Sequence, residues 1–514
     1  MGNYLALIDL GSNTARLVIY YDDGQGVIRE EDNVKRTLRL ISYLDENRRI
    51  TTTGFEKTLE CMHQFKDVCT AWNIQHIVGV ATAAVRQAQN GHELLQAIED
   101  ATGISIRLLS GEEEAHYGYL AVVNSMNVED AITVDIGGGS TELTRISQRR
   151  CVGRISLPFG AVSLTQWFLN DSGIPPANDW KRLFDYLKQQ FGSIDWLERQ
   201  RCPVIAMGGT ARNLAKIVQR QSQYSLSSLH HYEIQRKDID SVFTSLSQLS
   251  IEQRKQVPGL AKDRADVIVS GIAVFRALLE AAQSDTLITS NKGLRDGILF
   301  EQVLQKENRS RIDDVAMHSV GQLMRRYRVN IPHANHVRFL AMQLFDDMKQ
   351  LQLIPYGNFE RRILEIASLL HNIGLAINVY ETSQHTFYML SNILILGLTH
   401  RERILIATVA AYKNQKQFQK QLAQFPDILR KEDKQIVEKL GHIVLLARIL
   451  DRSMTQQIKS VRIKEKNKQL VIECYSAEEN LMEFSFIPEM LEKLSKLWKL
   501  SFQYKVVGER KRAL

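Results

Sequence analysis

The sequence predicts a duplicated α/β fold that is followed by an all-α domain and a small α+β domain. The chain has 514 residues, which is too long for one ordinary hydrophobic core. A strand, turn and strand pattern around Asp9 returns around Asp135, and such repetition indicates two related halves. After about residue 308, long amphipathic helical segments replace the alternating strands and helices. We therefore expect domains at residues 1–128, 129–307, 308–455 and 456–514.

The first half of the repeat begins with an apolar, strand-like segment at residues 4–9. A tight turn at residues 10–14 leads to a second strand at 15–21, so the pattern predicts a hairpin with a glycine at its tip. The other elements expected in this half are a helix near residues 58–72, a strand at 76–81, a helix near 91–101 and a strand at 105–109. Alternating strands and helices predict a mixed sheet that helices cover.

The second half repeats the hairpin on either side of a glycine-rich turn. Its expected elements are strands at residues 131–135, 141–146 and 204–207, the turn Gly208-Gly209-Thr210 and a helix from Ala211, with an end near Glu307. The helical domain is represented by segments at residues 337–351 and 359–370. The tail is expected to contain strands at 460–475 and 481–486, a helix at 488–500, a strand at 502–507 and the basic end Arg510-Lys511-Arg512.

Composition indicates a folded protein with an anionic partner. Hydrophobic residues make up 44% and charged residues 24% of the chain, which excludes disordered and fibrous classes. No apolar run is long enough to span a bilayer, and no signal-peptide pattern is found, so we expect a cytoplasmic protein. The five cysteines are odd in number and lack CxxC spacing, which indicates reduced thiols. The net charge of +7 fits polyphosphate, nucleic acid or acidic lipid, although no specific nucleic-acid motif is found.

The two hairpin tips carry residue types that are suited to phosphate and a divalent metal. Glycine lets backbone N–H groups approach phosphate oxygens closely, and small hydroxyl residues add donors. Asp9 and Asp135 can hold a hard cation such as Mg²⁺, directly or through water. The candidate phosphate-binding residues are Gly11, Ser12, Asn13, Thr14, Gly137, Gly138, Gly139, Ser140 and Thr141. One such hairpin is weak support because glycine and aspartate are common in turns, but two matched copies favour a phosphate site.

The duplicated hairpins resemble the phosphate loops of the superfamily that contains actin, hexokinase and other sugar kinases, and Hsp70 chaperones, with ribonuclease H-like domains. Three further stretches, residues 81–86, 110–115 and 134–143, together with residues 9–14, resemble the exopolyphosphatase / guanosine pentaphosphate phosphatase (Ppx/GppA) family. Residues 264–266 and 293–297 support this resemblance. The chain is most like the long form of that family, and most like exopolyphosphatase.

The resemblance implies roles for individual residues. Glu113 would be the general base that activates water, and Glu142 would join Asp9 and Asp135 as a metal-associated carboxylate. Arg86 would contact phosphate, since its guanidinium can bind two oxygens at once. Gly208 and Gly209 would close another part of the cleft. The resemblance also implies a homodimer, built partly through the C-terminal domains.

The helical domain carries a second pattern. His336, His371-Asn372, His385, His400 and Asp451 occur in an order that resembles HD-type metal phosphohydrolases. Those enzymes use adjacent His and Asp ligands, whereas this chain has asparagine at the second position, and asparagine is a poorer ligand for a catalytic metal pair. We therefore expect an HD-like fold that has lost its own chemistry.

These observations predict a metal-dependent hydrolase that releases orthophosphate processively from the ends of polyphosphate. The same cleft and base also suit a guanosine pentaphosphate (pppGpp) 5′-phosphohydrolase, and the motifs do not separate the two activities. Two other classes stay open: a kinase of the same superfold, and a non-enzymatic sensor of polyphosphate or an alarmone. The basic net charge is also compatible with peripheral membrane association.

Overall fold

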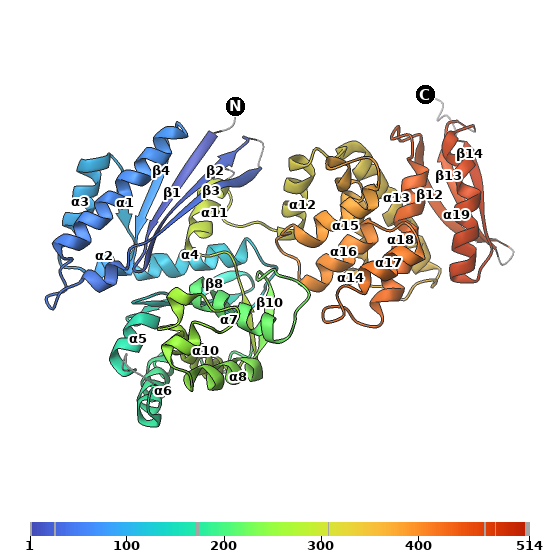
Figure 1. Ribbon diagram of the computed structural model, residues 1–514. Coiled ribbons are helices and arrows are strands. Elements are labelled where there is room, and N and C mark those ends of the chain that lie inside the picture. Colours follow the sequence, from blue (N-terminus) through green and yellow to red (C-terminus); the bar gives the residue numbers. More distant parts are fainter. Residues whose placement is uncertain are drawn as a thin grey trace. The chain divides into compact units, whose positions relative to one another are not determined.

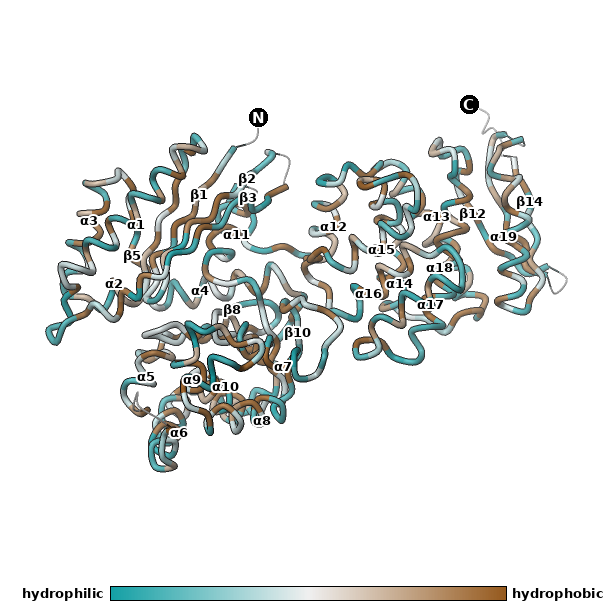
Figure 2. Tube along the Cα trace, viewed as in Figure 1, coloured by the Kyte–Doolittle hydropathy of each residue, from teal (hydrophilic) through white to brown (hydrophobic). Residues whose placement is uncertain are grey.

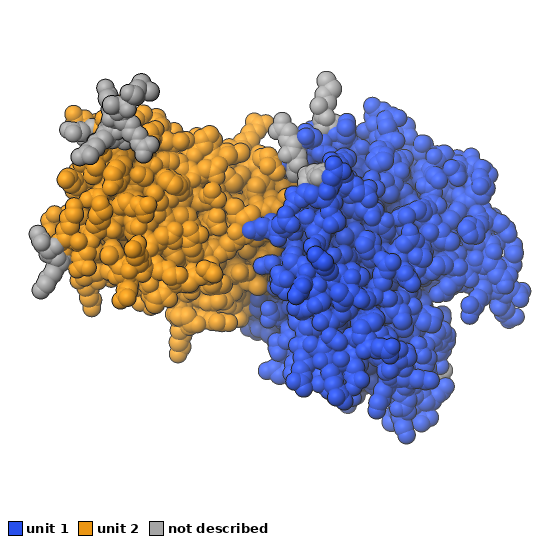
Figure 3. Space-filling view, turned by 180° about the vertical axis from the view of Figure 1, so that it is seen from behind, with its two compact units in different colours: residues 1–315 blue, residues 316–514 orange. Residues whose placement is uncertain are grey.

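The computed structural model describes residues 3–24, 27–169, 174–306, 308–466, 469–478 and 480–508 (Figure 1). The chain divides into two compact units, Met1–Val315 and Ala316–Leu514 (Figure 3). Glu307, near the expected domain end, and the basic end at residues 510–512 lie outside the described residues. In the described ranges, no helix is long and apolar enough to cross a membrane.

The first sheet of unit 1 has five strands in the order β3-β2-β1-β4-β5. Its strands are β1 (Asn3–Leu10), β2 (Thr14–Asp22), β3 (Ile28–Thr37), β4 (His76–Ala81) and β5 (Ile106–Leu108). The first three form an antiparallel meander, and β4 lies parallel to β1. The central strands are hydrophobic (Figure 2), and one face packs against α1 (Thr52–Ala71) and α3 (Gly91–Thr102) through buried residues such as Ile8 and Phe65.

The second sheet has six strands in the order β10-β11-β9-β6-β7-β8. Its strands are β6 (Ala131–Ile136), β7 (Thr141–Ser147), β8 (Arg150–Leu157), β9 (Val204–Met207), β10 (Tyr232–Gln235) and β11 (Thr286–Thr289). The helices of this half are α5 (Ala161–Phe168), α6 (Ala177–Gly192), α7 (Gly208–Gln221), α8 (Arg236–Ser247), α9 (Ile251–Arg254) and α10 (Ile268–Ala282). One large apolar cluster joins these helices to the sheet, so the second half has its own core.

Two helices, α4 (Gly111–Val123) and α11 (Leu294–Lys306), join the two sheets. A third apolar cluster contains Leu7 and Val18 from the first sheet, Ile205 and Met207 from the second, and residues of both helices. This shared core holds the two glycine-tipped hairpins, β1–β2 and β6–β7, in one compact unit.

Unit 2 is a helical domain followed by a small sheet. Its helices are α12 (Val315–Arg326, which starts at the unit boundary), α13 (Ile331–Gln350), α14 (Asn358–Leu370), α15 (Thr382–Asn392), α16 (His400–Ala410), α17 (Gln415–Leu422) and α18 (Asp433–Leu450). The sheet contains β12 (Ile458–Lys466), β13 (Gln469–Ser476) and β14 (Phe502–Gly508), and α19 (Met482–Trp498) precedes the last strand.

The strand predicted at residues 481–486 is wrong, because α19 begins there and continues through Pro488. Phe484, Ile487 and Leu491 are buried, and their spacing of three and four residues is that of a helix face. Proline lacks the N–H that would bond the preceding turn, so it is unusual inside a helix, and the sequence pattern favours a helix that starts at Pro488. The apolar packing of this face outweighs that single missing hydrogen bond.

Candidate active site

The two hairpin tips are built alike. In the first, the backbone N–H of Gly11 donates to the carbonyl of Thr14 at 3.0 Å, and in the second, Gly137 donates to Ser140 at 2.9 Å. The strand register then pairs Asp9 with Arg16 and Asp135 with Glu142. The repeat therefore matches Asp9 with Asp135. The residues opposite them differ, because the first hairpin has the basic Arg16 where the second has the acidic Glu142.

A cavity of about 180 Å³ is lined by residues of both tips. Seven of the predicted phosphate-binding residues line it: Gly11, Ser12, Asn13, Thr14, Gly137, Gly138 and Ser140. All three predicted metal-associated carboxylates, Asp9, Asp135 and Glu142, also line it, as do Gly209 and one further carboxylate, Glu114. The cavity thus combines glycine turns, hydroxyl groups and carboxylates, which is a lining suited to a phosphoryl group.

Glu113, the predicted base, lies outside this cavity. Its carboxylate accepts a hydrogen bond from the backbone N–H of Ser110 at 2.8 Å and pairs with Arg107 at 3.1 Å, so it caps the first turn of α4. The Glu113 side chain is 42% exposed, whereas that of Glu114 is 11% exposed and faces the cavity. The geometry therefore moves the candidate base by one residue, from Glu113 to Glu114.

The carboxyl groups of the cavity resist ionisation. Burial raises the pKa of Glu114 to about 7, and the neighbouring Arg86 opposes that rise. Burial raises the pKa of Asp9 and of Asp135, and the charge of Asp9 raises that of Asp135 further. Burial, together with the charges of Glu114 and Asp135, raises the pKa of Glu142 well above its usual range. A bound cation would relieve this crowding of negative charge.

Other predicted residues support the site without lining the cavity. Arg86 donates through Nη1 to the Leu109 carbonyl at 2.7 Å and to the Glu114 carboxylate, so it contacts the candidate base. Thr141 donates a buried hydrogen bond to the Phe159 carbonyl at 2.7 Å, so its hydroxyl stabilises the fold instead of lining the cavity. Gly139 accepts from Gln87 at 3.3 Å, and a Cβ added there would lie 2.9 Å from Ile41.

Gly208 lies beside Asp135 in a conformation that requires glycine. Its φ angle is +82°, and a Cβ added to it would lie 2.3 Å from Asp135 Oδ1. A second, larger cavity adjoins the first. Gly208 lines this second cavity, and Gly209 lines both cavities. The turn that the sequence marked as glycine-rich is thus the place where helix α7 approaches the second hairpin.

The larger cavity, of about 300 Å³, shares six lining residues with the first: Asp9, Thr14, Asp135, Gly209, Arg264 and Leu294. Six of its described lining residues are basic, namely Arg16, Lys35, Arg212, Lys216, Arg264 and Arg295, against four aspartates, Asp9, Asp135, Asp263 and Asp296. Arg295 Nη1 is buried without a hydrogen-bond partner among the described residues. A buried donor without a hydrogen bond costs folding free energy. An anion that accepted from Arg295 would remove this cost, so the cavity favours an anionic ligand.

The basic residues also disfavour one another. Burial and the charge of Arg295 lower the pKa of Arg16, and burial lowers that of Arg212 despite the nearby carboxylate of Asp135. An anionic ligand between these guanidinium groups would stabilise their charged forms. The lowered pKa values of Arg16 and Arg212 and the unsatisfied Nη1 of Arg295 therefore both favour an anionic ligand in this cavity.

Sequence reasoning did not assign these basic residues to the site. Arg264 and Arg295 stand in the two stretches, residues 264–266 and 293–297, that support the family resemblance. Arg16 could have been found by aligning the two hairpins, because it stands where the second hairpin has Glu142. Arg212 and Lys216 lie four residues apart on the helix that follows Gly208 and Gly209, and this spacing places them on one face.

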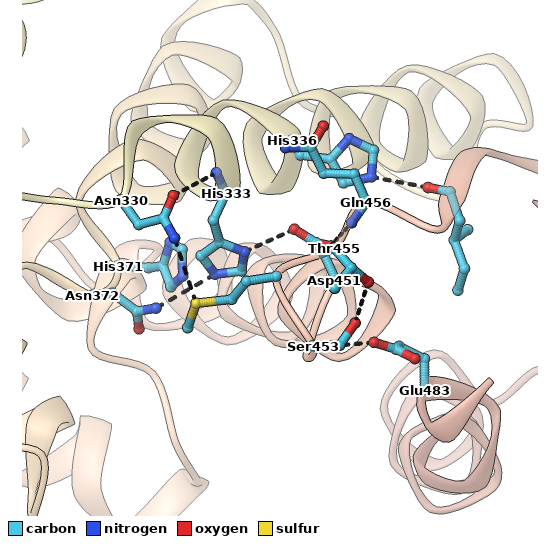
Figure 4. Close-up of polar contacts among 12 residues, drawn as sticks. Asn330, His333, His336, His371, Asn372, Asp451, Ser453, Thr455, Gln456 and Glu483 are labelled. Atoms are coloured by element: carbon cyan, nitrogen blue, oxygen red, sulfur yellow. Dashed lines mark hydrogen bonds and ion pairs between the residues drawn. The ribbon is translucent and has the colours of Figure 1, made fainter.

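A second polar cluster lies inside unit 2 (Figure 4). His333 on α13 pairs with Asp451 at 2.8 Å, and the Asn372 amide lies 3.5 Å from His333 Nε2. The rings of His333 and His371 are 5.2 Å apart, and His371 Nε2 is buried without a partner in the described residues. His333, rather than the predicted His336, therefore joins His371, Asn372 and Asp451.

His336 contacts the backbone carbonyl of Ile458 at 2.9 Å. His385 lies on α15, and His400 is the first residue of α16. Across the described part of the chain, no three His, Cys, Asp or Glu side chains are grouped closely enough to form a ready metal site. In unit 1, a metal would therefore need oxygen ligands from elsewhere as well, and phosphate can supply them.

Comparison with known proteins gives concordant matches along the chain. The family model described as Ppx/GppA phosphatase family matches residues 19–306, and the one described as Ppx/GppA phosphatase, domain III, matches residues 315–494. A guanosine-5′-triphosphate,3′-diphosphate pyrophosphatase of Vibrio vulnificus (strain YJ016) is 27% identical over 415 residues, which cover 79% of each chain.

Solved structures give the same likeness. A Ppx/GppA family member of Aquifex aeolicus matches with a TM-score of 0.53 and 29% identity, over 60% of this chain and 99% of that chain. An exopolyphosphatase from Cytophaga hutchinsonii ATCC 33406 matches with a TM-score of 0.53 and 20% identity, over 59% of this chain and 98% of that chain, which is a likeness of fold.

Proposed function

Because this chain belongs to the Ppx/GppA phosphatase family, whose members hydrolyse phosphoanhydride bonds, we propose that it removes terminal phosphate from inorganic polyphosphate. The observation that carries the proposal is the Glu114 carboxylate, which faces a cavity between two glycine-tipped hairpins, beside a larger cavity rich in arginine and lysine. The smaller cavity would receive the terminal phosphoryl group, and the basic cavity would bind the phosphates that follow it.

The reaction requires a water molecule in line with the bond that breaks. Glu114 accepts a proton from that water as its oxygen bonds to the terminal phosphorus. The bridging P–O bond breaks, and its electron pair leaves with the shortened chain. Arg86 orients Glu114 through their hydrogen bond, while hydroxyl and backbone groups of the tips bind the non-bridging oxygens. Orthophosphate is the product.

We assign Asp9 and Asp135 as the residues that would hold Mg²⁺ or another divalent cation. Both aspartates line both cavities, and both have a pKa that burial raises, so a cation would stabilise their ionised forms. Glu142 is a less direct candidate, because Ser156 donates to its carboxylate at 2.9 Å. A bound cation would supply charge neutralisation for the phosphate oxygens.

The lining of the basic cavity supports polyphosphate, rather than a nucleotide, as the substrate. Among the described residues that line it, none is aromatic, and only Ala261 and Leu294 are apolar. A purine base is usually bound by stacking and apolar contacts, whereas a phosphate chain needs only cations and hydrogen-bond donors. This lining favours the polymeric anion.

The second candidate is pppGpp 5′-phosphohydrolase activity. The observation that favours it is the Vibrio vulnificus relative, whose name gives a guanosine nucleotide as substrate and which is matched over 79% of its length. In that case the same Glu114 would act on the 5′-terminal phosphate, and the basic cavity would hold the remaining phosphates of the nucleotide.

For unit 2 we propose an HD-like helical arrangement without metal chemistry, and a contribution to a homodimer. The cluster of His333, His371 and Asp451 supports the HD-like arrangement, and the neutral Asn372 disfavours a catalytic metal pair. The division into domains at residues 1–128, 129–307, 308–455 and 456–514 is likewise a proposal. It places one sheet in each of the first two domains and the small third sheet in the last.

The test is orthophosphate release from long-chain polyphosphate and from pppGpp, each with and without Mg²⁺. A higher kcat/KM for polyphosphate that depends on metal is the expected result. A higher value for pppGpp would replace the main proposal with the second. Release from neither substrate would contradict both.

A further inference from the structure

The candidate base and the anion-binding arginine lie on two helices that pack against each other (Figure 1). Helix α4 carries Glu114 in its first turn, and α11 begins with Leu294 and Arg295, which line the basic cavity. The two helices are in close backbone contact, since a Cβ added to Gly297 would lie 2.0 Å from the Tyr117 carbonyl oxygen. The relative position of these helices therefore sets the distance between Glu114 and Arg295.

Tyr117 forms a polar link between the helices. Its hydroxyl donates to Glu301 on α11 at 2.9 Å and accepts from Arg107 at 2.7 Å. The Tyr117 residue is 4% exposed, and it lies three positions after Glu114, nearly one helical turn away. Burial raises the pKa of Tyr117, so the hydroxyl keeps its proton and remains a donor to Glu301. This link touches neither cavity.

We propose that Tyr117, acting through Glu301, is a positioning residue that fixes Glu114 relative to the phosphate-binding arginines. The inference rests on the proposed phosphatase function. Loss of the hydroxyl leaves the Glu301 carboxylate without this donor and lets α4 shift against α11. A misplacement of about 1 Å at a catalytic group can cost about 100-fold in rate, so even a small shift is measurable.

The test compares Tyr117→Phe with Tyr119→Phe in the full chain. Tyr119 lies on the same helix, and its hydroxyl donates to the Arg149 carbonyl at 3.0 Å, so its variant loses a similar hydrogen bond away from α11. We expect Tyr117→Phe to lower kcat by about 10-fold or more while KM changes less than about 2-fold. Tyr119→Phe is expected to lose a similar amount of thermal stability but to keep its kcat.

Glu301 provides the second arm of the experiment. Glu301→Ala should reproduce the loss of kcat, whereas Glu301→Gln, which keeps an acceptor for the tyrosine hydroxyl, should restore most of it. The double variant Tyr117→Phe with Glu301→Ala should be no slower than either single variant, because both remove one interaction.

Three outcomes would overturn the inference: an unchanged kcat in Tyr117→Phe, equal losses in the Tyr117 and Tyr119 variants, or additive losses in the double variant. If the unmodified protein released phosphate from neither substrate, the proposed function would fail and the inference with it. An active unmodified protein with an equally active Tyr117→Phe would reject the inference alone.

Discussion

At the scale of single residues, the neighbours Glu113 and Glu114 have different surroundings: Glu113 caps helix α4, and Glu114 lines the smaller cavity. Consecutive residues of a helix point about 100° apart, so only one of them can face the cavity. Glu113 stands three residues after Ser110, which is the spacing of a capping box, and its side chain returns to the Ser110 backbone. Helix geometry then turns Glu114 towards the two hairpin tips.

The same residue predicts the pH dependence of the reaction. Glu114 must be ionised to accept a proton, and burial raises its pKa to about 7. The rate constant kcat should therefore be nearly constant above that pH and fall about tenfold per pH unit below it. A pH profile of kcat on polyphosphate provides the measurement. An acidic limb in the ordinary glutamate range, near about pH 4.3, would contradict this assignment.

At the scale of elements, the site depends on where turns meet strands. Strand β9 ends at Met207, and α7 begins at Gly208, where positive φ and the lack of a Cβ let Asp135 lie close to the backbone. The sequence showed the glycines and the preceding strand, so the turn was predictable. Its contact with Asp135 was not, because that contact joins residues more than seventy positions apart.

Gly208→Ala should abolish most activity, because its Cβ would overlap Asp135 Oδ1 and its backbone would be strained. The matched control is Gly103→Ala, whose φ angle is +68° but whose added Cβ meets no atom within 4 Å. Both variants should lose about 1 kcal/mol of unfolding free energy or more from the positive φ angle. Only Gly208→Ala should lose phosphate release, as measured by kcat/KM. Equal loss of activity in the two variants would mean that backbone strain at the positive φ angle, rather than the contact with Asp135, causes the loss.

At the scale of the whole molecule, the duplicated hairpins and the change to helices near residue 308 were readable from the sequence. The sequence did not predict which basic residues of distant segments come together in the larger cavity. Arg16, Arg212 and Arg295 come from a strand and two helices of different halves, and no local pattern connects them. In unit 2, His333 replaced His336 for a similar reason, since helix packing decides which of two histidines one turn apart faces Asp451.

The division of the chain into two compact units predicts that hydrolysis needs only unit 1. Unit 1 contains all residues of both cavities, and its end is fixed by a hydrogen bond from the Ile312 backbone to Asn124 at 2.8 Å. A fragment of residues 1–315 should therefore hydrolyse short polyphosphate while losing processive action on long chains. Product lengths on a gel, compared with orthophosphate release from a short substrate, give the readout. The expected difference assumes that unit 2 helps to hold long polyphosphate chains during successive rounds of hydrolysis. Equal loss on both substrates would contradict that role.

The central claim is that Glu114, rather than Glu113, activates water. Its most direct test is orthophosphate release from polyphosphate by Glu114→Gln and Glu113→Gln, measured with Mg²⁺ at about pH 8, which is above the pKa of about 7 to which burial raises Glu114. Glutamine can keep the capping role at position 113, so that variant should retain most activity, whereas Glu114→Gln should lose about 100-fold or more in kcat while still binding polyphosphate. The reverse ranking, or equal losses in both variants, would contradict the account.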